Sequence, residues 1–437
     1  MMKYIPNTKN DLKDMLKIIG EKSTDNLISK IIPDNLRPKK GLEIGDPLSE
    51  YDLLLDVECL KKNNKKLICF NGGGVYDHYI PSAVDFLSSR SEFYTSYTPY
   101  QAEVSQGTLQ YLYEFQSMIS ELSGLDVSNA SLYDGASAVA EACSMAVNIT
   151  SKNKILLSKT INPNYLDVLK TYLSNRSINV DFIHHDDGIT DLNHKIQNIE
   201  DYACIAIQSP NYFGIIEDWS RWSEKINDKC LLVSISDPQS LSILKSPGDS
   251  GADIYCGEGQ TLGNYMNFGG PFLGLLSSKL KYIRKMPGRL IGKTEDIEGK
   301  EGYVLTLQAR EQHIRRDKAN SNICTNQSLL ALRASIYMSL MGHKGLSKLS
   351  KVCFDKSHYA AKEISKLSKF RLPYCNSFVK EFVVETTIDI DDLIANAVNE
   401  GISLSKLNNS ENKLLIAVTE KRTRAEIDLL ISFLKKQ

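Results

Sequence analysis

The sequence predicts an α/β protein with a mostly parallel, doubly wound sheet. From residue 65 onward, short apolar runs (KLICF, KILLS, ACIAIQ, CLLVSI and ADIYC) alternate with segments of helical periodicity such as GTLQYLYEFQSMISELSG, which Gly124 should end. Strands that alternate with helices form parallel sheets covered on both faces. The 437 residues, 42% hydrophobic and 24% charged, are enough for a large core and more than one domain.

Three segments follow one another along the chain. Residues 1–64 combine short helical patterns with proline and glycine breaks, which predicts a helical arm. Residues 65–324 hold the alternating strands and helices and are expected to form the large domain. A long helical stretch then leads to SFVKEFVVET, a helix from Asp391, KLLIAVTE and a closing helix from Arg424. We therefore expect residues 325–437 to form a smaller C-terminal α/β domain.

Charge and cysteine usage limit the partners and the compartment. The 52 basic and 53 acidic residues nearly cancel and form no long run of one sign, which argues against nucleic acid and anionic membranes. No uninterrupted stretch of about 18 apolar residues is present, so we expect no membrane span. The nine cysteines form no C-x-x-C pair, and the N-terminus resembles neither a secretory signal nor a transit peptide. Both features favour a cytoplasmic protein with reduced thiols.

The run HHDD at residues 184–187 is a candidate metal site, since histidine and aspartate both bind metals. It follows the apolar strand INVDFI and precedes Gly188, however, and a polar turn at a strand end explains it better. We expect no metal site. The P-loop, H-E-x-x-H and G-x-S-x-G patterns do not occur in the sequence either, which disfavours several other enzyme classes.

A loop rich in tyrosine, EFYTSYTPYQAEVSQG, spans residues 92–107. Such a loop is a poor core element but a good pocket lining, because tyrosine offers both apolar area and a hydroxyl group. A subunit interface would explain the same composition, and both interpretations stay open. The glycine-rich segment FNGGGVYDHYIP precedes it and allows close backbone approach to a ligand or to another segment.

Two further segments indicate a phosphate-type site. Asp134 to Ser137 stand at the expected start of a helix, whose free amides attract anions, although capping by Asp134 explains the same residues. An apolar strand ends at Asp237, and the loop GEGQTLGNYMNFGGP follows some twenty residues later. Enzymes that use pyridoxal phosphate place the partner of their pyridine nitrogen and their lysine in this way. Here the loop offers Gln260 and no lysine.

At these residues the chain resembles the glycine dehydrogenase (decarboxylating) family, the P-protein of the glycine cleavage system, in the split form with separate alpha and beta subunits. The resemblance lies in YDHYIPSAVDFLSSRSEFYTSYTPYQAEVSQGTLQYLYEFQ, DVSNASLYDGASAVAEA, GADIYCGEGQTLGNYMNFGGPFLG and KANSNICTNQSLLAL, and it covers essentially the whole chain. The strings YTPYQ-x-E-x-SQG and SNICTNQ are long and specific.

The resemblance implies a fold-type-I aminotransferase-like architecture and an alpha subunit that works with a beta subunit, as a heterodimer that is doubled to α2β2. It implies that pyridoxal 5′-phosphate is bound covalently by the beta subunit, and that the assembly decarboxylates glycine and passes the aminomethyl group to the lipoyl arm of H-protein. In this chain Gln260 stands where the Schiff-base lysine would be, and Asp237 with Gln260 would form a degenerate cofactor site. The expected lining of the shared active site is Tyr76, Tyr97, Tyr100, Gln101 and Glu103.

Two other interpretations remain. The chain could be a scaffold without catalytic residues that only stabilises the beta subunit. It could also be a free-standing pyridoxal-phosphate enzyme that uses another lysine, such as Lys245 or Lys293. The first of these lies in an amphipathic, surface-like stretch soon after Asp237, which makes this third interpretation the weakest.

Overall fold

The structure is a computed structural model that describes residues 6–95, 97–226, 228–323, 325–374 and 376–437. The chain divides into two compact units, Met1–Lys65 and Lys66–Gln437. The first unit is the predicted helical arm, with α1 (Lys9–Ile18), α2 (Thr24–Ile31) and α3 (Glu50–Lys62). Each helix begins at a Thr or Ser cap, yet none of the three contains a buried residue. Within this unit, propensity and capping are what favour the helices, because the three helices bury no residue against one another.

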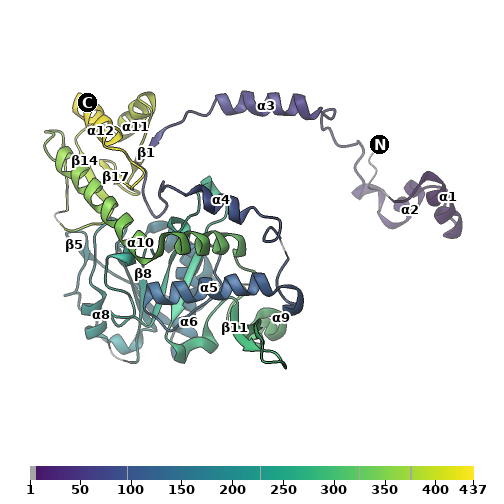
Figure 1. Cartoon of the computed structure of the whole chain (residues 1–437), viewed down its shortest axis with the longest axis horizontal. Helices are drawn as coiled ribbons and strands as arrows, with labels where there is room; N and C mark the ends of the chain where they lie inside the picture. Colours follow the sequence, from purple (N-terminus) through teal and green to yellow (C-terminus); the bar gives the residue numbers. More distant parts are fainter. Residues whose placement is uncertain (1–5, 96, 227, 324, 375) are drawn as a thin grey trace. The chain divides into compact units, whose positions relative to one another are not determined.

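The second unit is built on a seven-stranded sheet in the order β2-β10-β9-β8-β7-β3-β4 (Figure 1). The strands from β9 to β4 are parallel to one another, whereas β10 runs antiparallel to both of its neighbours. This confirms the mostly parallel sheet. The strands are β2 (Val127–Ser128), β3 (Lys154–Ser158), β4 (Asn179–Ile183), β7 (Cys204–Gln208), β8 (Leu231–Ile235), β9 (Ile254–Glu258) and β10 (Gly274–Ser278).

Helices cover both faces of this sheet. Within β7, Ile205 and Ile207 pack into one core and Cys204 and Ala206 into another, as the alternation of side chains along a strand requires. The first core also holds residues of α4 (Ser82–Ser88), α5 (Gln106–Ser123), α8 (Trp219–Lys225) and the first part of α10 (Ser328–Ile364). The second holds residues of α6 (Gly135–Thr150) and α7 (Pro163–Leu173). Because each face of the sheet lies against an apolar core, its strands appear in the sequence as continuous apolar runs.

The C-terminal part has a second, antiparallel sheet in the order β13-β14-β17-β16. Its strands are β13 (Phe370–Arg371), β14 (Glu381–Thr386), β16 (Ser405–Lys406) and β17 (Lys413–Ala417), and α11 (Ile390–Asn399), α12 (Arg424–Lys436) and the end of α10 pack against it. Residues after 325 thus form a second sheet with its own helices, within the single compact unit Lys66–Gln437. One strand prediction needs correction: KLICF contributes only β1 (Ile68–Cys69), which pairs with β15 (Ile402–Ser403) and not with the large sheet.

Shorter elements complete the unit. Two antiparallel pairs stand apart from the large sheets: β5 (His185–Asp186) with β6 (Ile189–Thr190), and β11 (Leu290–Glu295) with β12 (Glu301–Thr306). The first pair shows that the HHDD run forms a hairpin. A four-residue helix, α9 (Gln312–Arg315), follows β12. Seven cysteines within the described residues are free thiols, while Cys324 and Cys375 lie outside them. Among the described residues, no helix has the length and apolar character needed to cross a membrane.

Helices α1 and α12 both begin with a capping box, so removing the cap from each shows which helix contributes to the stability of the second unit. Thr423 accepts a hydrogen bond from the amide of Glu426 (3.2 Å), and α12 buries four apolar residues. Thr8 and Asp11 form the same motif in α1, which buries none. We predict that Thr423→Ala lowers the free energy of unfolding of the second unit by about 1 kcal/mol and that Thr8→Ala leaves it unchanged.

Urea unfolding followed by tryptophan fluorescence measures this difference, because both tryptophans, Trp219 and Trp222, are buried in the second unit. Equal loss of stability in the two variants would contradict the assignment of α1 to a separate unit.

Candidate functional site

Polar side chains from both sheets meet where β8 and β9 end. Asp237 follows β8, Glu258 is the last residue of β9, and Gln260 follows directly in a short 3-10 turn. Lys380 precedes the first residue of β14 in the second sheet. The carboxyl ends of parallel strands are where α/β proteins bind ligands, because the loops there leave a crevice. The sequence and the fold thus both indicate a candidate ligand site at the carboxyl ends of β8 and β9.

Asp237 makes an ion pair with Lys380. The distance between Oδ2 of Asp237 and Nζ of Lys380 is 2.7 Å, and both side chains are largely buried. The hydroxyl groups of Thr261 (2.8 Å) and Ser240 (3.0 Å) also donate to this carboxylate. Burial raises the pKa of Asp237, but the ammonium of Lys380 outweighs burial, and the net pKa is lowered. The pair is therefore ionised, and its hydrogen bonds compensate for lost hydration.

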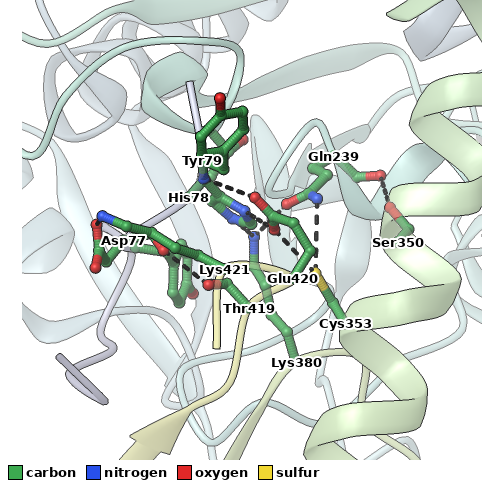
Figure 2. A network of polar contacts seen from close by, with 12 residues as sticks. Asp77, His78, Tyr79, Gln239, Ser350, Cys353, Lys380, Thr419, Glu420 and Lys421 are labelled. Carbon is green, nitrogen blue, oxygen red and sulfur yellow. Dashed lines mark hydrogen bonds and ion pairs between the residues drawn. The ribbon is translucent and has the colours of Figure 1, made fainter. Parts of the chain in front are cut away.

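The ammonium of Lys380 has three acceptors. Besides Asp237, Nζ donates to Oε1 of Gln239 (2.8 Å) and to Nε2 of His78 (3.0 Å). Figure 2 shows Lys380, Gln239 and His78 converging from three segments of the chain. The ammonium also lies 4.1 Å from the centre of the Tyr76 ring, which adds a cation–π contact. An ammonium group has three protons, so this lysine is fully satisfied.

His78 carries the network on to Glu420. Because an ammonium group can only donate, Nε2 of His78 accepts, and Nδ1 carries the proton that it shares with Oε2 of Glu420 at 2.6 Å. The amide of Tyr79 (2.7 Å) and the thiol of Cys353 (3.4 Å) also donate to Glu420 (Figure 2). Burial raises the pKa of Glu420, but His78 and the amide of Tyr79 outweigh it and lower that pKa to about 2.

His78, Cys353 and Glu420 have ligand atoms within 4.8 Å of one another, a spacing that a metal ion would suit. Their chemistry opposes this use. Both nitrogens of His78 are engaged, one of them by a cation, and burial raises the pKa of the Cys353 thiol to about 12, far from the thiolate that binds metals. We interpret this cluster as a hydrogen-bond network.

Gln260 is almost fully buried, and its carboxamide binds backbone on both sides. Its Oε1 accepts from the amide of Tyr76 (3.0 Å), and its Nε2 donates to the carbonyls of Tyr76 (3.1 Å) and Asn264 (2.8 Å). A lysine side chain has no acceptor and could not make the bond to the Tyr76 amide. Gln260 therefore fixes the glycine-rich segment around Tyr76 against the loop after β9.

Glu258 accepts from three backbone amides. Its Oε2 bonds the amide of Gly135 at 2.8 Å, in the first turn of α6, and its Oε1 bonds the amides of Gln260 (3.0 Å) and Leu273 (2.9 Å). Asp134 caps the same helix through the amide of Ser137 (2.7 Å). Burial raises the pKa of Glu258 to about 8, while the three amides act in the opposite direction. The anion site expected at this helix start is thus filled by side chains of the chain itself.

The loop after α4 lines a different hollow, which we call the tyrosine hollow. Its volume is about 280 Å³, and its lining comes from the two most specific strings of the sequence and from one arginine: Tyr97, Thr98, Pro99, Arg289, Thr325, Asn326, Gln327, Ser328 and Leu329. The hydroxyl of Tyr100 accepts from Arg289 (3.2 Å), whose guanidinium also stacks on the Tyr100 ring. The side-chain amide of Asn326 donates to the carbonyl of Ala130 (2.8 Å).

The predicted lining residues fall into two groups. Tyr97 lines the tyrosine hollow, Tyr100 contacts its Arg289, and Gln101 accepts a hydrogen bond from Tyr97 (3.3 Å). Glu103 follows in the 3-10 turn Ala102–Val104, and all four side chains are exposed. Tyr76 does not join them. It is buried beside Asp237 and Gln260, and its hydroxyl donates to Glu381 (2.9 Å).

Sequence reasoning missed Lys380 and Glu258. The signal for Lys380 was available, since a lysine and a glutamate adjoin at the start of the apolar strand FVVET, where charges are expensive unless paired. Lys245 and Lys293 make other contacts. Nζ of Lys245 donates to the hydroxyl of Ser220 (3.1 Å), and Lys293 makes an ion pair with Glu301 across the β11–β12 hairpin.

The fold is that of the fold-type-I enzymes, a class that depends on pyridoxal phosphate. A solved C-DES variant with glycine covalently linked to the PLP cofactor shares the fold, with a TM-score of 0.62 at 11% identity over 86% of this chain and 97% of its own. A solved glycine decarboxylase (P-protein) of the glycine cleavage system, in inhibitor-bound form, gives a TM-score of 0.93 at 36% identity and full coverage of both chains.

The model of the family "Glycine cleavage system P-protein" matches residues 2–434. A relative from Desulforamulus reducens, named probable glycine dehydrogenase (decarboxylating) subunit 1, is 46% identical over 98% of both chains. The chain belongs to the P-protein family of the glycine cleavage system, whose members include proteins named as one subunit of an enzyme.

The pKa of Glu420 predicts how stability depends on pH. A carboxyl group whose pKa is lowered from 4.5 to about 2 in the folded state stabilises that state above pH 4.5, by roughly 3 kcal/mol, and loses this contribution as the pH falls toward 2. We predict that Glu420→Gln destabilises the protein at neutral pH and that its difference from the wild type shrinks as the pH falls below 4.5. Urea unfolding at several pH values in this range measures the difference in free energy of unfolding. A difference that did not change with pH would show that the network does not lower the pKa of Glu420.

Proposed function

We propose that this chain is the alpha subunit of a P-protein and that it acts only together with a beta subunit that holds pyridoxal 5′-phosphate covalently. The buried carboxamide of Gln260 carries this proposal, because it occupies the loop position expected of the Schiff-base lysine and is committed to backbone hydrogen bonds. The family membership and the name subunit 1 of the relatives support a partner chain. We further propose a cytoplasmic α2β2 assembly, in keeping with the free thiols.

The proposed reaction is the decarboxylation of glycine, with transfer of the aminomethyl group to the lipoyl arm of H-protein. Bound by the beta subunit, pyridoxal phosphate supplies the electron sink for this chemistry. The contribution of the alpha subunit is to orient the reactants and to exclude water.

The tyrosine hollow is the best candidate for this contribution. It combines the aromatic side chain of Tyr97, several amide and hydroxyl groups, and the single cation among its nine lining residues, Arg289. Arg289 is held by Tyr100 and Asn326, so its charge is oriented before a ligand arrives. We propose that it faces the carboxylate of glycine at the shared site, since guanidinium groups match carboxylates in geometry.

Exposed apolar side chains support a large interface with the beta subunit. Near the tyrosine hollow, Tyr94, Tyr97, Tyr100 and Val104 are each about half exposed or more. The arm adds an apolar set along its three helices and the segments between them: Leu12, Met15, Ile18, Ile19, Ile28, Ile31, Ile32, Leu36, Leu42, Ile44, Leu48, Leu53, Leu54, Leu55, Val57 and Leu60. Exposed apolar side chains in such number support contacts with another protein.

A scaffold without a catalytic role remains the competing interpretation, and Tyr100 separates the two. We predict that Tyr100→Phe, which removes the hydroxyl bonded to Arg289, lowers glycine turnover by about 10²-fold, equivalent to roughly 2.7 kcal/mol, while the complex keeps its melting temperature. We expect Glu103→Gln to impair turnover more than assembly as well. Tyr359→Phe is the matched control, because its hydroxyl bonds Asp428 (2.6 Å) in the small domain.

Turnover is assayed as glycine decarboxylation with H-protein and the beta subunit in excess, beside thermal melts of each complex. If Tyr100→Phe and Glu103→Gln both turned over at the wild-type rate, the chain would be a scaffold and the proposed lining would be wrong.

The arm gives a prediction about assembly. Leu54 is 60% exposed on α3, and a carboxylate in its place would have to be buried unpaired in any interface that covers this helix. We predict that Leu54→Asp weakens association with the beta subunit by at least about tenfold and leaves the melting temperature of the isolated chain unchanged. Asn63→Asp, at the end of the same helix, adds the same charge as a control. Sedimentation of mixed chains measures the affinity, and equal binding by both variants would exclude the arm from the interface.

A further inference from the structure

Pyridoxal phosphate has two charged ends, and this chain has kept both of the features that bind them in related enzymes. A phosphate group suits the amides at a helix start, here the first turn of α6. A protonated ring nitrogen suits an aspartate at a strand end, here Asp237. Whether the cofactor fits this chain therefore depends on what these two features contact now.

The helix start is occupied by Glu258. Its carboxylate takes the amides of Gly135, Gln260 and Leu273, at 2.8 to 3.0 Å, which are donors of the kind a phosphate group requires. The fit is close, because a Cβ at position 135 would come within 2.8 Å of the Cβ of Glu258. A glycine is therefore needed for the carboxylate to reach the helix.

Asp237 is occupied in the same way. The ammonium of Lys380 lies 2.7 Å from Oδ2, with Gln239 and His78 as its remaining acceptors. A protonated pyridine nitrogen and this ammonium would compete for the same carboxylate. Gln239 and His78 hold the lysine from two other segments of the chain (Figure 2).

Little space remains between the two ends. The cavity lined by Tyr76, Tyr165, Asp237, Glu258 and Lys380 has a volume of about 30 Å³, which suits two or three water molecules but no aromatic ring. The cofactor does not fit this chain.

We propose that the cofactor site of this chain has become an internal lock, in which the carboxyl oxygens of Glu258 take the amides that would hold a phosphate and the ammonium of Lys380 takes the place of the protonated ring nitrogen. Lys380 adjoins β14 of the second sheet and Asp237 follows β8 of the large sheet, so their pair ties the two sheets together. The pocket thus has a structural role that is independent of the reaction at the shared site.

Lys380 does not take the role of the missing Schiff-base lysine. The carbon that reacts with an enzyme lysine is bonded to the ring position opposite the nitrogen, whereas Lys380 binds the partner of that nitrogen. A ring seated on Asp237 would therefore displace Lys380 instead of reacting with it.

The lock is tested by emptying the helix start in the full-length chain without the beta subunit. Glu258→Ala removes the carboxylate and leaves three amide donors beside the existing cavity, so inorganic phosphate should bind there. We expect phosphate to raise the melting temperature of this variant and to bind it at least about tenfold more tightly than the wild type. Glu258→Gln is the matched control, because its side chain still fills the space and should gain no phosphate binding.

Wild-type protein gives a second measurement that needs no variant to fold. Pyridoxine 5′-phosphate keeps both charged ends of the cofactor and lacks the aldehyde that reacts with surface lysines. We expect no saturable binding by fluorescence titration. Saturable binding to the wild type, or a folded Glu258→Ala variant that gains no affinity for phosphate, would overturn the proposal. Neither measurement involves glycine turnover, so failure here would leave the proposed function untouched.

Discussion

The ion pair between Asp237 and Lys380 is the interaction on which the arrangement of the second unit depends. Burying two charges costs free energy unless they form a well-aligned ion pair and their remaining hydrogen-bonding groups also find partners. Here Gln239 and His78 take the remaining protons of Lys380, and Thr261 and Ser240 donate to Asp237. Loss of one partner would leave the other charge buried alone, so these segments must assemble together.

The network also explains why several buried carboxyl groups titrate so differently. Burial raises the pKa of each, but Asp237 and Glu420 face Lys380 and His78 and titrate below the ordinary range. Glu258 and Glu381 receive hydrogen bonds mainly from amides and a hydroxyl, and burial raises their pKa values to about 8 and about 7. The hydrogen-bond and charge partners of each carboxyl group, and not burial alone, set the direction of its pKa shift.

Much of the fold could be predicted from the sequence, because strand and helix periodicities are local. KILLS, ACIAIQ, CLLVSI and ADIYC all became strands of the large sheet. KLICF failed as a member of that sheet because its partner, β15, lies far away in the sequence. For the same reason Asp237 could be predicted as a site residue but its bond to Lys380 could not, since no local pattern shows which lysine crosses between domains.

The candidate site was predictable only in part. The tyrosine-rich loop and SNICTNQ were each recognisable as unusual strings, yet their meeting at Arg289 required the fold. Tyr76 lies in the glycine-rich segment that precedes the tyrosine-rich loop in the sequence. The hydrogen bonds between its backbone and Gln260 hold it in the interior, away from that loop. A residue's neighbours along the chain therefore did not determine which of the two pockets it lines.

The exposed apolar residues of the arm have a consequence for how the protein must be made. The first unit buries none of the apolar side chains of helices α1, α2 and α3 within itself. Such surfaces drive self-association when their intended partner is missing. Cells that make this chain thus gain from producing it in step with its partner, so that the helices are covered soon after synthesis and the pool of unassembled chain stays small.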